Sequence, residues 1–321
     1  MSRAASGAGG GPRLSIVVPV YNSATLVKAL VGEIHSALAG SPRAFELILV
    51  NDGSRDESWS EIVSAADRHP WILGINLMRN YGQHNALLAG IQHARGEIIV
   101  TLDDDLQHPP AEIHKLIAAL DAGSDVVYGV PDRERHGLLR DLASQISKLA
   151  LRAVMRIQIA EQTSAFRAFR SQAIQAHMNF NGPFVDIDAL LAWGTSRFAT
   201  VTVRHMERRD GVSNYTFYGL VSHALKMVTA FSTLPLRVAT VTGFVFMIFS
   251  VGVLAWVIGR YLIEGEGVPG FPFLASIIGL FSGAQLFAMG IMGEYLAKIH
   301  LRSMGRPASV VRERTRGPGD P

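Results

Sequence analysis

The sequence predicts an α/β protein with a mostly parallel, doubly wound sheet that is followed by two membrane-spanning helices. Short apolar runs rich in β-branched residues alternate with segments of helical periodicity between residues 14 and 102. This alternation is typical of a parallel sheet with helices on both faces. Two long stretches without a charged residue follow near the C-terminus. The chain therefore combines one large domain with a predicted membrane anchor.

The elements of this domain follow one another closely along the chain. The predicted strands are residues 14–20, 45–50, 72–77, 97–102 and 125–128. The predicted helices are residues 24–38, 58–68 and 85–94. Right-handed crossovers place the loops that follow parallel strands at one edge of the sheet. The polar loops after the first four strands should therefore converge on one crevice.

Three consecutive aspartates, Asp103 to Asp105, come directly after the fourth predicted strand. Because side chains alternate along an extended chain, Asp103 and Asp105 should point the same way, with Gln107 next on that side. Oxygen ligands of this kind suit Mg²⁺ or Mn²⁺ carried by a phosphorylated substrate. A solvated acidic turn is the alternative, but the position at the carboxyl end of a strand favours a metal–nucleotide site.

Composition removes several other classes of site. The chain has 321 residues and no cysteine, which excludes disulfides, thiolate chemistry and cysteine-based metal centres. The formal net charge of +3 does not suggest a nucleic-acid partner. No P-loop is present, and the early glycines precede the first strand, which argues against an ATPase and a dinucleotide oxidoreductase. Residues 1–12 are expected to form a flexible tail.

The high apolar content, 48% of residues with a mean hydropathy of +0.22, is concentrated near the C-terminus. A helix needs roughly 20 apolar residues to cross a bilayer. We therefore predict two transmembrane helices, about residues 238–260 and 271–293, within a hairpin at 236–296. Basic residues precede and follow this segment, and residues 297–321 form a basic tail. By the positive-inside rule, the domain and both termini are expected at the cytoplasmic side of an inner membrane.

Two further segments mix apolar residues with cationic ones at helical spacing. They are residues 140–159 and the juxtamembrane stretch 214–235. Both are predicted to lie in the headgroup plane with their apolar side facing the lipid. Packing of either segment on the soluble domain is the alternative.

Several strings together resemble the inverting family 2 glycosyltransferases, although each is weak alone. They are VVPVYN at 17–22, VNDGSRDES at 50–58, NYGQHNALLAG at 80–90 and LDDDLQHPPAEI at 102–113. The resemblance continues through QTSAFRAF at 162–169 and ERRDGVSNYTF at 207–217, and it covers roughly residues 13–310. The architecture is similar to that of the polyisoprenyl-phosphate glycosyltransferases.

This resemblance implies a GT-A domain at 13–213 that moves one sugar, with inversion, from a nucleoside-diphosphate sugar to polyprenyl phosphate. A UDP-linked donor and a bilayer-bound acceptor are expected from the resemblance alone. The residues that it assigns to nucleotide binding are Pro19, Tyr21, Asn22, Asp52, Asp103 and Asp104. It assigns the metal, Mg²⁺ or Mn²⁺, to Asp103, Asp105 and Gln107, and catalysis to Asp105 and Arg208. The expected contacts to acceptor or phosphate are Arg133, Arg135, Arg167 and Ser213.

The sequence departs from the family pattern at four places, one of which is Ser23, where an acid usually follows VYN. Asn51 replaces the first acid of the usual DDGS, Ala165 stands at a usual glycine, and Asn214 replaces a usual lysine. Simpler roles remain open for some site residues: Asp52 as a turn residue, Tyr21 as core packing and Arg208 as a membrane-side anchor. His84 and His108 are expected to be polar packing groups, because the oxygen ligands of Asp103, Asp105 and Gln107 suffice to bind a metal.

Two other functions share part of this pattern. A processive polysaccharide synthase normally has more spans and a Gln-x-x-Arg-Trp element, and this chain contains no Arg-Trp pair. A membrane protein that only senses a sugar nucleotide would tolerate loss of the aspartates, yet all three are present. Transfer to a lipid phosphate is therefore favoured. Spans of this kind often associate, so a homo-oligomer is left open.

Overall fold

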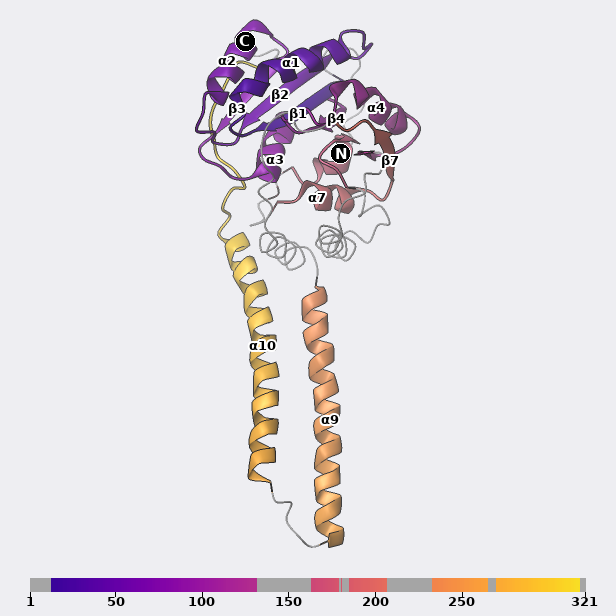
Figure 1. Cartoon of the computed structure of the whole chain (residues 1–321), viewed down its shortest axis with the longest axis vertical. Helices are drawn as coiled ribbons and strands as arrows, with labels where there is room; N and C mark the ends of the chain where they lie inside the picture. The colour runs from indigo at the N-terminus through magenta and orange to yellow at the C-terminus, as the bar shows by residue number, and fades with distance from the viewer. Residues whose placement is uncertain are drawn as a thin grey trace, which may run out of the picture.

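Two long helices run side by side away from an α/β domain in this computed structural model (Figure 1). The structure describes residues 13–131, 163–178, 180, 185–206, 233–264 and 270–317. The predictions for the tail 1–12, for the segment 140–159 and for most of the segment 214–235 concern residues outside these ranges. The same holds for the predicted site residues Arg133, Arg135, Arg208 and Ser213.

The domain is built on an eight-stranded sheet with the order β7-β5-β6-β4-β1-β2-β3-β8. Its parallel centre consists of β1 (Leu14–Val20), β2 (Phe45–Asn51), β3 (Ile72–Leu77) and β4 (Ile98–Thr101). Beyond β4, β6 (Arg167–Arg170) is antiparallel to both of its neighbours, and β5 (Val126–Pro131) pairs in parallel with β7 (Phe198–Val203). The predicted mostly parallel sheet is confirmed.

Helices cover both faces of the sheet, as the sequence predicted. On one face lie α1 (Ala24–Leu38), α2 (Ser58–Arg68) and, after the short 3₁₀ turn Pro110–Glu112, α4 (Ile113–Asp121). On the other lie α3 (Gln83–His93), the short α6 (Gln172–Gln175) and α7 (Ile187–Gly194). In α1, for example, the buried residues recur every three or four positions, so they form one apolar face that packs on the sheet. They are Val27, Leu30, Val31, Ile34 and Leu38.

The last strand, β8 (Val311–Arg314), comes from the segment that the sequence analysis treated only as a basic tail. It pairs antiparallel with β3 and forms an edge of the sheet. Its sequence, Val-Arg-Glu-Arg, is exposed throughout and shows no apolar alternation. Charged residues on an edge strand are a common protection against aggregation. The chain therefore returns to the domain after the second long helix.

The two long helices are α9 (Leu234–Glu264) and α10 (Phe271–Ser303), which confirms helices at both predicted spans. They contact each other, for example through the edge-to-face rings of Phe246 and Phe281 at 5.4 Å. Among the described residues, only 234–263 meets the length and hydropathy of a membrane span, and none of it is buried. Ile263, for instance, is 85% exposed. An apolar surface of this extent normally faces lipid or a partner.

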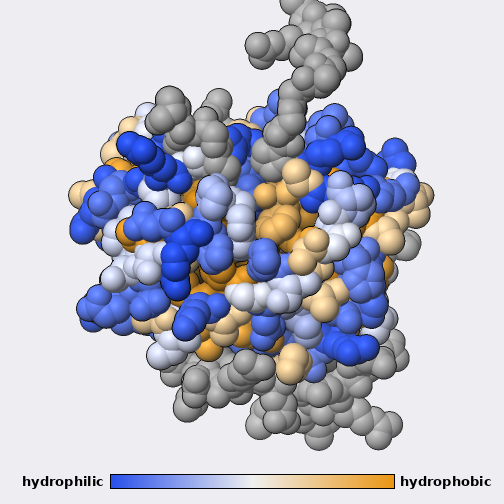
Figure 2. All heavy atoms as spheres, turned by 90° about the horizontal axis from the view of Figure 1, so that it is seen from above, coloured by the Kyte–Doolittle hydropathy of each residue, from blue (hydrophilic) through white to orange (hydrophobic). Residues whose placement is uncertain are grey.

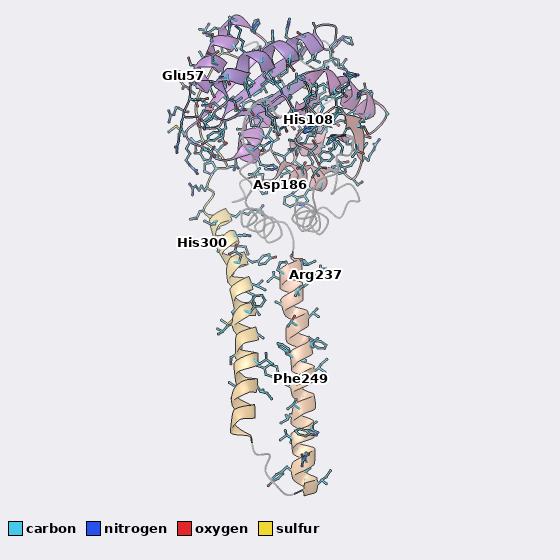
Figure 3. All side chains as sticks on the ribbon, in the orientation of Figure 1. Glu57, His108, Asp186, Arg237, Phe249 and His300 are labelled. Atoms are coloured by element: carbon cyan, nitrogen blue, oxygen red, sulfur yellow. The ribbon has the colours of Figure 1, made fainter. Side chains whose placement is uncertain are left out.

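Charged or titratable residues occur near both ends of this helix pair, with Arg260 at the end of α9 far from the domain. Figure 3 shows Arg237 and His300 at the domain-proximal ends of α9 and α10, with Phe249 farther along α9. Seen from the end opposite the long helices, the domain surface is mostly hydrophilic, with apolar side chains in small patches (Figure 2). The molecule is thus polar at one end and strongly apolar at the other.

Candidate active site

A cavity of about 440 Å³ lies at the carboxyl ends of the parallel strands. This is the edge at which open α/β sheets bind their ligands. The lining residues come from the end of β1, the start of α3 and the loops after β1, β2, β3 and β4: Pro19, Tyr21, Asp52, Asn80, Gly82, Gln83, Asp103, Asp104, Asp105 and Gln107. The structure thus brings together every described residue predicted for nucleotide or metal binding except Asn22.

The turn after the aspartates fixes the relation between Asp105 and Gln107. Leu106 has a φ of +59°, which is unusual for a residue with a side chain, and its side chain is buried in the core. The resulting kink lets the backbone N–H of Gln107 donate to Oδ1 of Asp105 at 3.1 Å. Core packing therefore holds a strained turn at the mouth of the site.

Gln83 contacts the first aspartate, and the sequence analysis gave this residue no role. It is the first residue of α3, and its Nε2 donates to Oδ1 of Asp103 at 2.6 Å. Gln83 belongs to the family-like string NYGQH, which could have marked it as a site residue. The string does not predict that the loop after β3 contacts the loop after β4.

Asp104, the middle residue of the triplet, ties two loops together. Its Oδ2 accepts from the backbone N–H of Tyr21 at 3.3 Å. Burial raises the pKa of Asp104, hydrogen bonds from Ser23 and Tyr21 oppose this rise, and the neighbouring Asp105 adds to it. The three aspartates therefore have different partners and different electrostatic surroundings.

Asp52 joins the loop after β2 to the start of α3. Its two carboxylate oxygens accept from the backbone N–H groups of Tyr81 at 2.7 Å and Gly82 at 2.9 Å. Burial raises the pKa of Asp52, while these two hydrogen bonds and the charge of Arg79 oppose the rise. Asp52 is thus a loop-stabilising residue that also lines the cavity.

Asn22 supports the site from outside the cavity. Its backbone N–H donates to Oγ of Ser54 at 3.0 Å, and its Oδ1 accepts from the N–H of Arg55 at 2.8 Å. Its φ of +54° is tolerated better by asparagine than by most residues. Asn22 therefore shapes the loop after β2.

The departure at Asn51 has a structural explanation. Its Nδ2 donates to Oδ1 of Asn76 at 2.8 Å, and its Oδ1 accepts from the N–H of Ser54 at 3.3 Å. Asn76 in turn donates to Oε1 of Glu313 on β8 at 2.9 Å. An aspartate at position 51 could accept but not donate, so this chain of bonds suits an amide.

The structure corrects the predicted role of Arg167 in binding an acceptor phosphate. Its side chain is only 2% exposed and forms an ion pair with Asp188 on α7, which also accepts from the Tyr128 hydroxyl at 2.8 Å. A guanidinium buried in this way is committed to its carboxylate. Arg167 therefore holds α7 against the sheet and does not line the cavity.

The two histidines near the site make packing contacts, as the sequence predicted. The His108 ring stacks on Phe166 with ring centroids at 5.3 Å, and it packs against the tilted ring of His205 at 5.1 Å. Its pKa is lowered, chiefly by burial and then by His205. His84 accepts from the backbone N–H of Ile187 through Nδ1 at 3.2 Å. Figure 3 labels His108 in the domain, and Asp186, which lies close to the two long helices.

The donor set in the cavity fits a hard divalent cation. The carboxylates of Asp103 and Asp105 and the amide of Gln107 line the same space, and oxygen atoms of this kind suit Mg²⁺ or Mn²⁺. Within the described part of the chain, no group of three histidine, aspartate or glutamate side chains is arranged to hold a metal. The amide oxygen of Gln107 would therefore have to complete the set.

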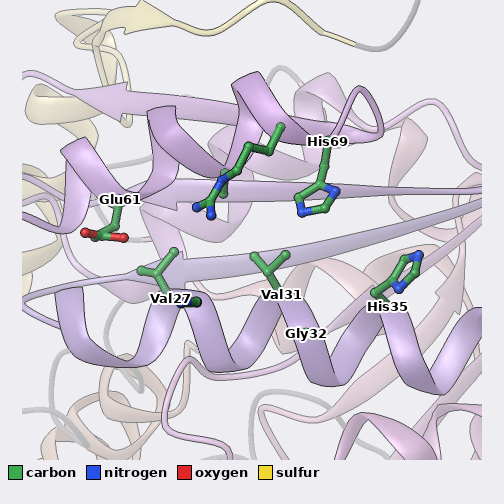
Figure 4. A pocket seen from close by; sticks show the side chains of 9 residues that line it. Val27, Val31, Gly32, His35, Glu61 and His69 are labelled. Carbon is green, nitrogen blue, oxygen red and sulfur yellow. The ribbon is translucent and has the colours of Figure 1, made fainter.

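A separate hollow of about 220 Å³ lies between α1 and α2 and is shown in Figure 4. Apolar residues such as Val27 and Val31 share it with His35, Glu61 and His69. None of the predicted site residues that the structure describes lines it. It is therefore distinct from the cavity at the strand ends.

Comparison with known proteins gives the following relatives. The sequence model of "Glycosyl transferase family 2" matches residues 15–178. The undecaprenyl-phosphate 4-deoxy-4-formamido-L-arabinose transferase of Shewanella sediminis is 34% identical over 304 residues, which cover 94% of this chain and 92% of that protein. The transferase of the same name from Salmonella choleraesuis is 35% identical over 306 residues, with coverages of 94% and 93%.

Solved structures share the fold at much lower sequence similarity. A mycobacterial protein matches with a TM-score of 0.51 and 18% identity over 68% of this chain and 74% of that chain. The glucosyl-3-phosphoglycerate synthase of Mycobacterium tuberculosis, solved with Mn²⁺ and UDP-glucose, matches with a TM-score of 0.50 and 18% identity over 68% and 78%. These structures support the fold of the domain.

Proposed function

The chain belongs to glycosyl transferase family 2 and is a glycosyltransferase, and we propose that it moves one sugar from a nucleoside-diphosphate sugar to a polyprenyl phosphate. The observation that carries this proposal is the cavity lined by Asp52, Asp103 to Asp105 and Gln107. The same chain also has two long apolar helices. The names of the two transferases supply the acceptor class, since both act on undecaprenyl phosphate.

The nucleotide is proposed to lie between the loops after β1 and β2, against Pro19, Tyr21 and Asp52, with Asn22 supporting them. We propose a UDP-linked donor, which the resemblance of the sequence motifs favours. Asp103, Asp105 and Gln107 would hold Mg²⁺ or Mn²⁺ on the diphosphate. When bound, the metal supplies Lewis-acid stabilisation of the leaving diphosphate.

The polyprenyl phosphate acceptor depends more on correct positioning than on a general base that would remove a proton from it. A phosphate monoester has a second pKa near 6, so the acceptor is mostly dianionic at neutral pH. The main tasks of the protein are alignment for in-line attack and stabilisation of the departing charge. Arg133, Arg135, Arg208 and Ser213 are retained as proposed contacts to the phosphate groups, Arg208 with a catalytic role.

We propose that α9 and α10 both span the inner membrane, with residues 214–235 at the interface and the domain at 13–213 on the cytoplasmic side. Both termini would then be cytoplasmic. Two features support this topology. The apolar side chains along α9 are exposed, and β8 returns the chain to the same sheet after α10.

Labelled sugar transfer tests the function directly. The purified full chain would be incubated with undecaprenyl phosphate, Mg²⁺ or Mn²⁺ and a panel of UDP- and GDP-sugars, and the lipid products would be separated. A lipid carrying a single sugar is the expected product. A long polymer would instead identify a processive synthase, and donor binding without any product would identify a sensor.

A further inference from the structure

A polar pocket of about 240 Å³ lies where α10 meets the domain, and it shares no lining residue with the cavity at the strand ends. It combines two arginines with neutral polar and apolar side chains. Its lining residues are Arg79, Tyr81, Asn85, Leu301, Arg306, Pro307 and Ala308. They come from two segments of the chain that are more than two hundred residues apart.

Pairing between β3 and β8 brings these two segments together. The strands are antiparallel with Leu77 opposite Val311, so the chain leaving β3 and the chain entering β8 lie at the same end. Gly305, with a φ of +62°, ends α10 and turns the chain toward the domain. Ala308 then packs against the core. Arg306 is held beside Arg79 by this path.

The two arginines give the lining of the pocket a positive charge. Neither forms an ion pair with a carboxylate among the described residues. Arg79 lies 4.1 Å over the ring of Tyr81 and donates Nη1 to the carbonyl oxygen of Asn80 at 3.0 Å, which holds its guanidinium in place. A guanidinium presents several donors in a plane and matches the geometry of phosphate oxygens.

The position of the pocket suggests where this anion comes from. Leu301 is in the last turn of α10, and Figure 3 shows the neighbouring His300 at the domain-proximal end of that helix. We propose that the pocket between Arg79 and Arg306 binds the phosphate of a membrane lipid at the bilayer surface. The proposal rests on the membrane placement of α9 and α10 proposed above.

The pocket shares a wall with the cavity at the strand ends. Along the loop after β3, Asn80, Gly82 and Gln83 line that cavity, whereas Arg79, Tyr81 and Asn85 line the pocket. A lipid phosphate bound here would restrain the loop after β3, whose backbone N–H groups donate hydrogen bonds to Asp52. Lipid binding is therefore expected to strengthen the binding of the sugar nucleotide.

Binding of lipid to the purified full chain in neutral detergent tests the proposal by native mass spectrometry. The probes are phosphatidylglycerol, undecaprenyl phosphate, phosphatidylcholine and inorganic phosphate. Arg306→Gln should weaken binding of the preferred lipid about tenfold, because charge-assisted hydrogen bonds to the phosphate are lost. Arg302→Gln is the matched control: it removes one positive charge from the same end of α10, but Arg302 faces Phe180 and does not line the pocket.

The outcomes separate the sources of the phosphate. An Arg306-dependent preference for phosphatidylglycerol supports a phospholipid, and the same dependence for undecaprenyl phosphate alone supports the acceptor. An equal loss of lipid binding in Arg306→Gln and Arg302→Gln would show only non-specific electrostatic attraction and would overturn the proposal. The proposal would also be overturned if inorganic phosphate bound as well as the lipids, or if Arg306→Gln lost no lipid binding. Thermal unfolding checks that each variant is folded, and Arg79→Gln tests the opposite wall of the pocket.

Sugar transfer is measured separately on the same protein. If no donor sugar is transferred but lipid binding still depends on Arg306, the proposed function fails and the lipid site stands. If transfer occurs and lipid binding is insensitive to Arg306, only the lipid site fails.

Discussion

Each of the three consecutive aspartates is held by a different partner, and this division is the main residue-scale feature of the site. Asp103 accepts from Gln83, Asp104 from the backbone of Tyr21 and Asp105 from the backbone of Gln107. The three identical residues therefore differ in their hydrogen-bond partners. Asp103 and Asp105 are the proposed metal ligands, and Asp104 is a loop tie.

Asp105→Ala should leave a folded protein with at least about a hundredfold lower transfer activity, since one stabilising group on a developing charge is worth roughly 3–4 kcal/mol. The rate of sugar–lipid formation measures this. Asp67→Ala is the control, because it removes an exposed aspartate from α2. Near-normal turnover of Asp105→Ala would contradict the assignment.

The pH dependence of stability should reveal the burial of Asp104. Its pKa is raised above the ordinary value of 3.8, so the folded state holds this proton more tightly than the unfolded state does. The group therefore favours folding at low pH, and this contribution is lost as the pH rises through the folded pKa. Asp104→Asn, which keeps an acceptor oxygen without the charge, should unfold at a higher temperature than wild type at pH 7.

The difference between the two proteins should shrink as the pH is lowered through the raised pKa and disappear below about 3.8. Thermal unfolding of wild type and Asp104→Asn, measured in parallel across this pH range, gives the difference in unfolding temperature. The contributions of the other titrating groups are the same in both proteins and cancel in this difference. A difference that does not change with pH would count against the burial of a charged Asp104.

At the scale of elements, loops and strands that are distant in sequence hold the site through short polar contacts. Asn51 on β2, Asn76 on β3 and Glu313 on β8 form one chain of hydrogen bonds behind the cavity. The edge strand thus supports the loop that contains Asp52.

Glu313→Ala should destabilise the protein by about 1–3 kcal/mol, because it leaves the buried amide of Asn76 without its acceptor. Glu313→Gln retains an acceptor oxygen and should recover most of this loss. Thermal or denaturant unfolding of both variants in detergent provides the measurement. Equal destabilisation by alanine and glutamine would show that the hydrogen bond is not responsible.

At Gly53 the loop after β2 approaches the backbone of the loop after β3 closely. It has a φ of +66°, and an added Cβ would lie 2.4 Å from the backbone C of Arg79 and the backbone N of Asn80. Gly53→Ala should therefore cost at least about 1 kcal/mol from the left-handed conformation alone and weaken nucleotide binding. Unfolding and UDP binding measure the two effects.

Gly32→Ala is the opposite case and serves as the control. Gly32 lies in α1 and nothing lies within 4 Å of an added Cβ. The substitution should stabilise the helix by roughly 0.5–1 kcal/mol. Similar effects of both substitutions would argue against a specific close approach at Gly53.

At the scale of the whole molecule, a polar domain and an apolar helix pair are joined at two places. One connection is the start of α9 and the other is the return of β8 to the sheet. The first residues of α9 and the last residues of α10 therefore lie at the end of the helix pair that faces the domain (Figure 1). A bilayer around the helices would place the domain and β8 on one side.

The natural absence of cysteine allows this topology to be tested cleanly. Leu262→Cys places a thiol at the end of α9 far from the domain, and Ser303→Cys places one at the domain-proximal end of α10. In intact spheroplasts, a membrane-impermeant maleimide should label position 262 only, and position 303 should react after permeabilisation. Labelling of both positions from outside would contradict a hairpin.

The sequence alone determined the elements whose information is local. The strands from β1 to β4 and the helices α1 and α2 follow from periodicity, and their observed and predicted bounds agree closely. The two long helices follow from uncharged runs, but both extend beyond the predicted spans. The convergence of Pro19, Tyr21, Asp52 and the aspartates was also predictable, because parallel strands with right-handed crossovers place their loops at one edge.

Only the tertiary structure decided which distant segments meet. The four exposed residues of β8 carry no strand periodicity, so their pairing with β3 depends on an edge that exists only once the sheet has formed. Arg167 occurs in a motif that suggested phosphate binding, but the folded sheet places it beside Asp188 in the core. The contact of Gln83 with Asp103 and the pocket between Arg79 and Arg306 likewise arise from pairing over long separations, which local sequence patterns do not encode.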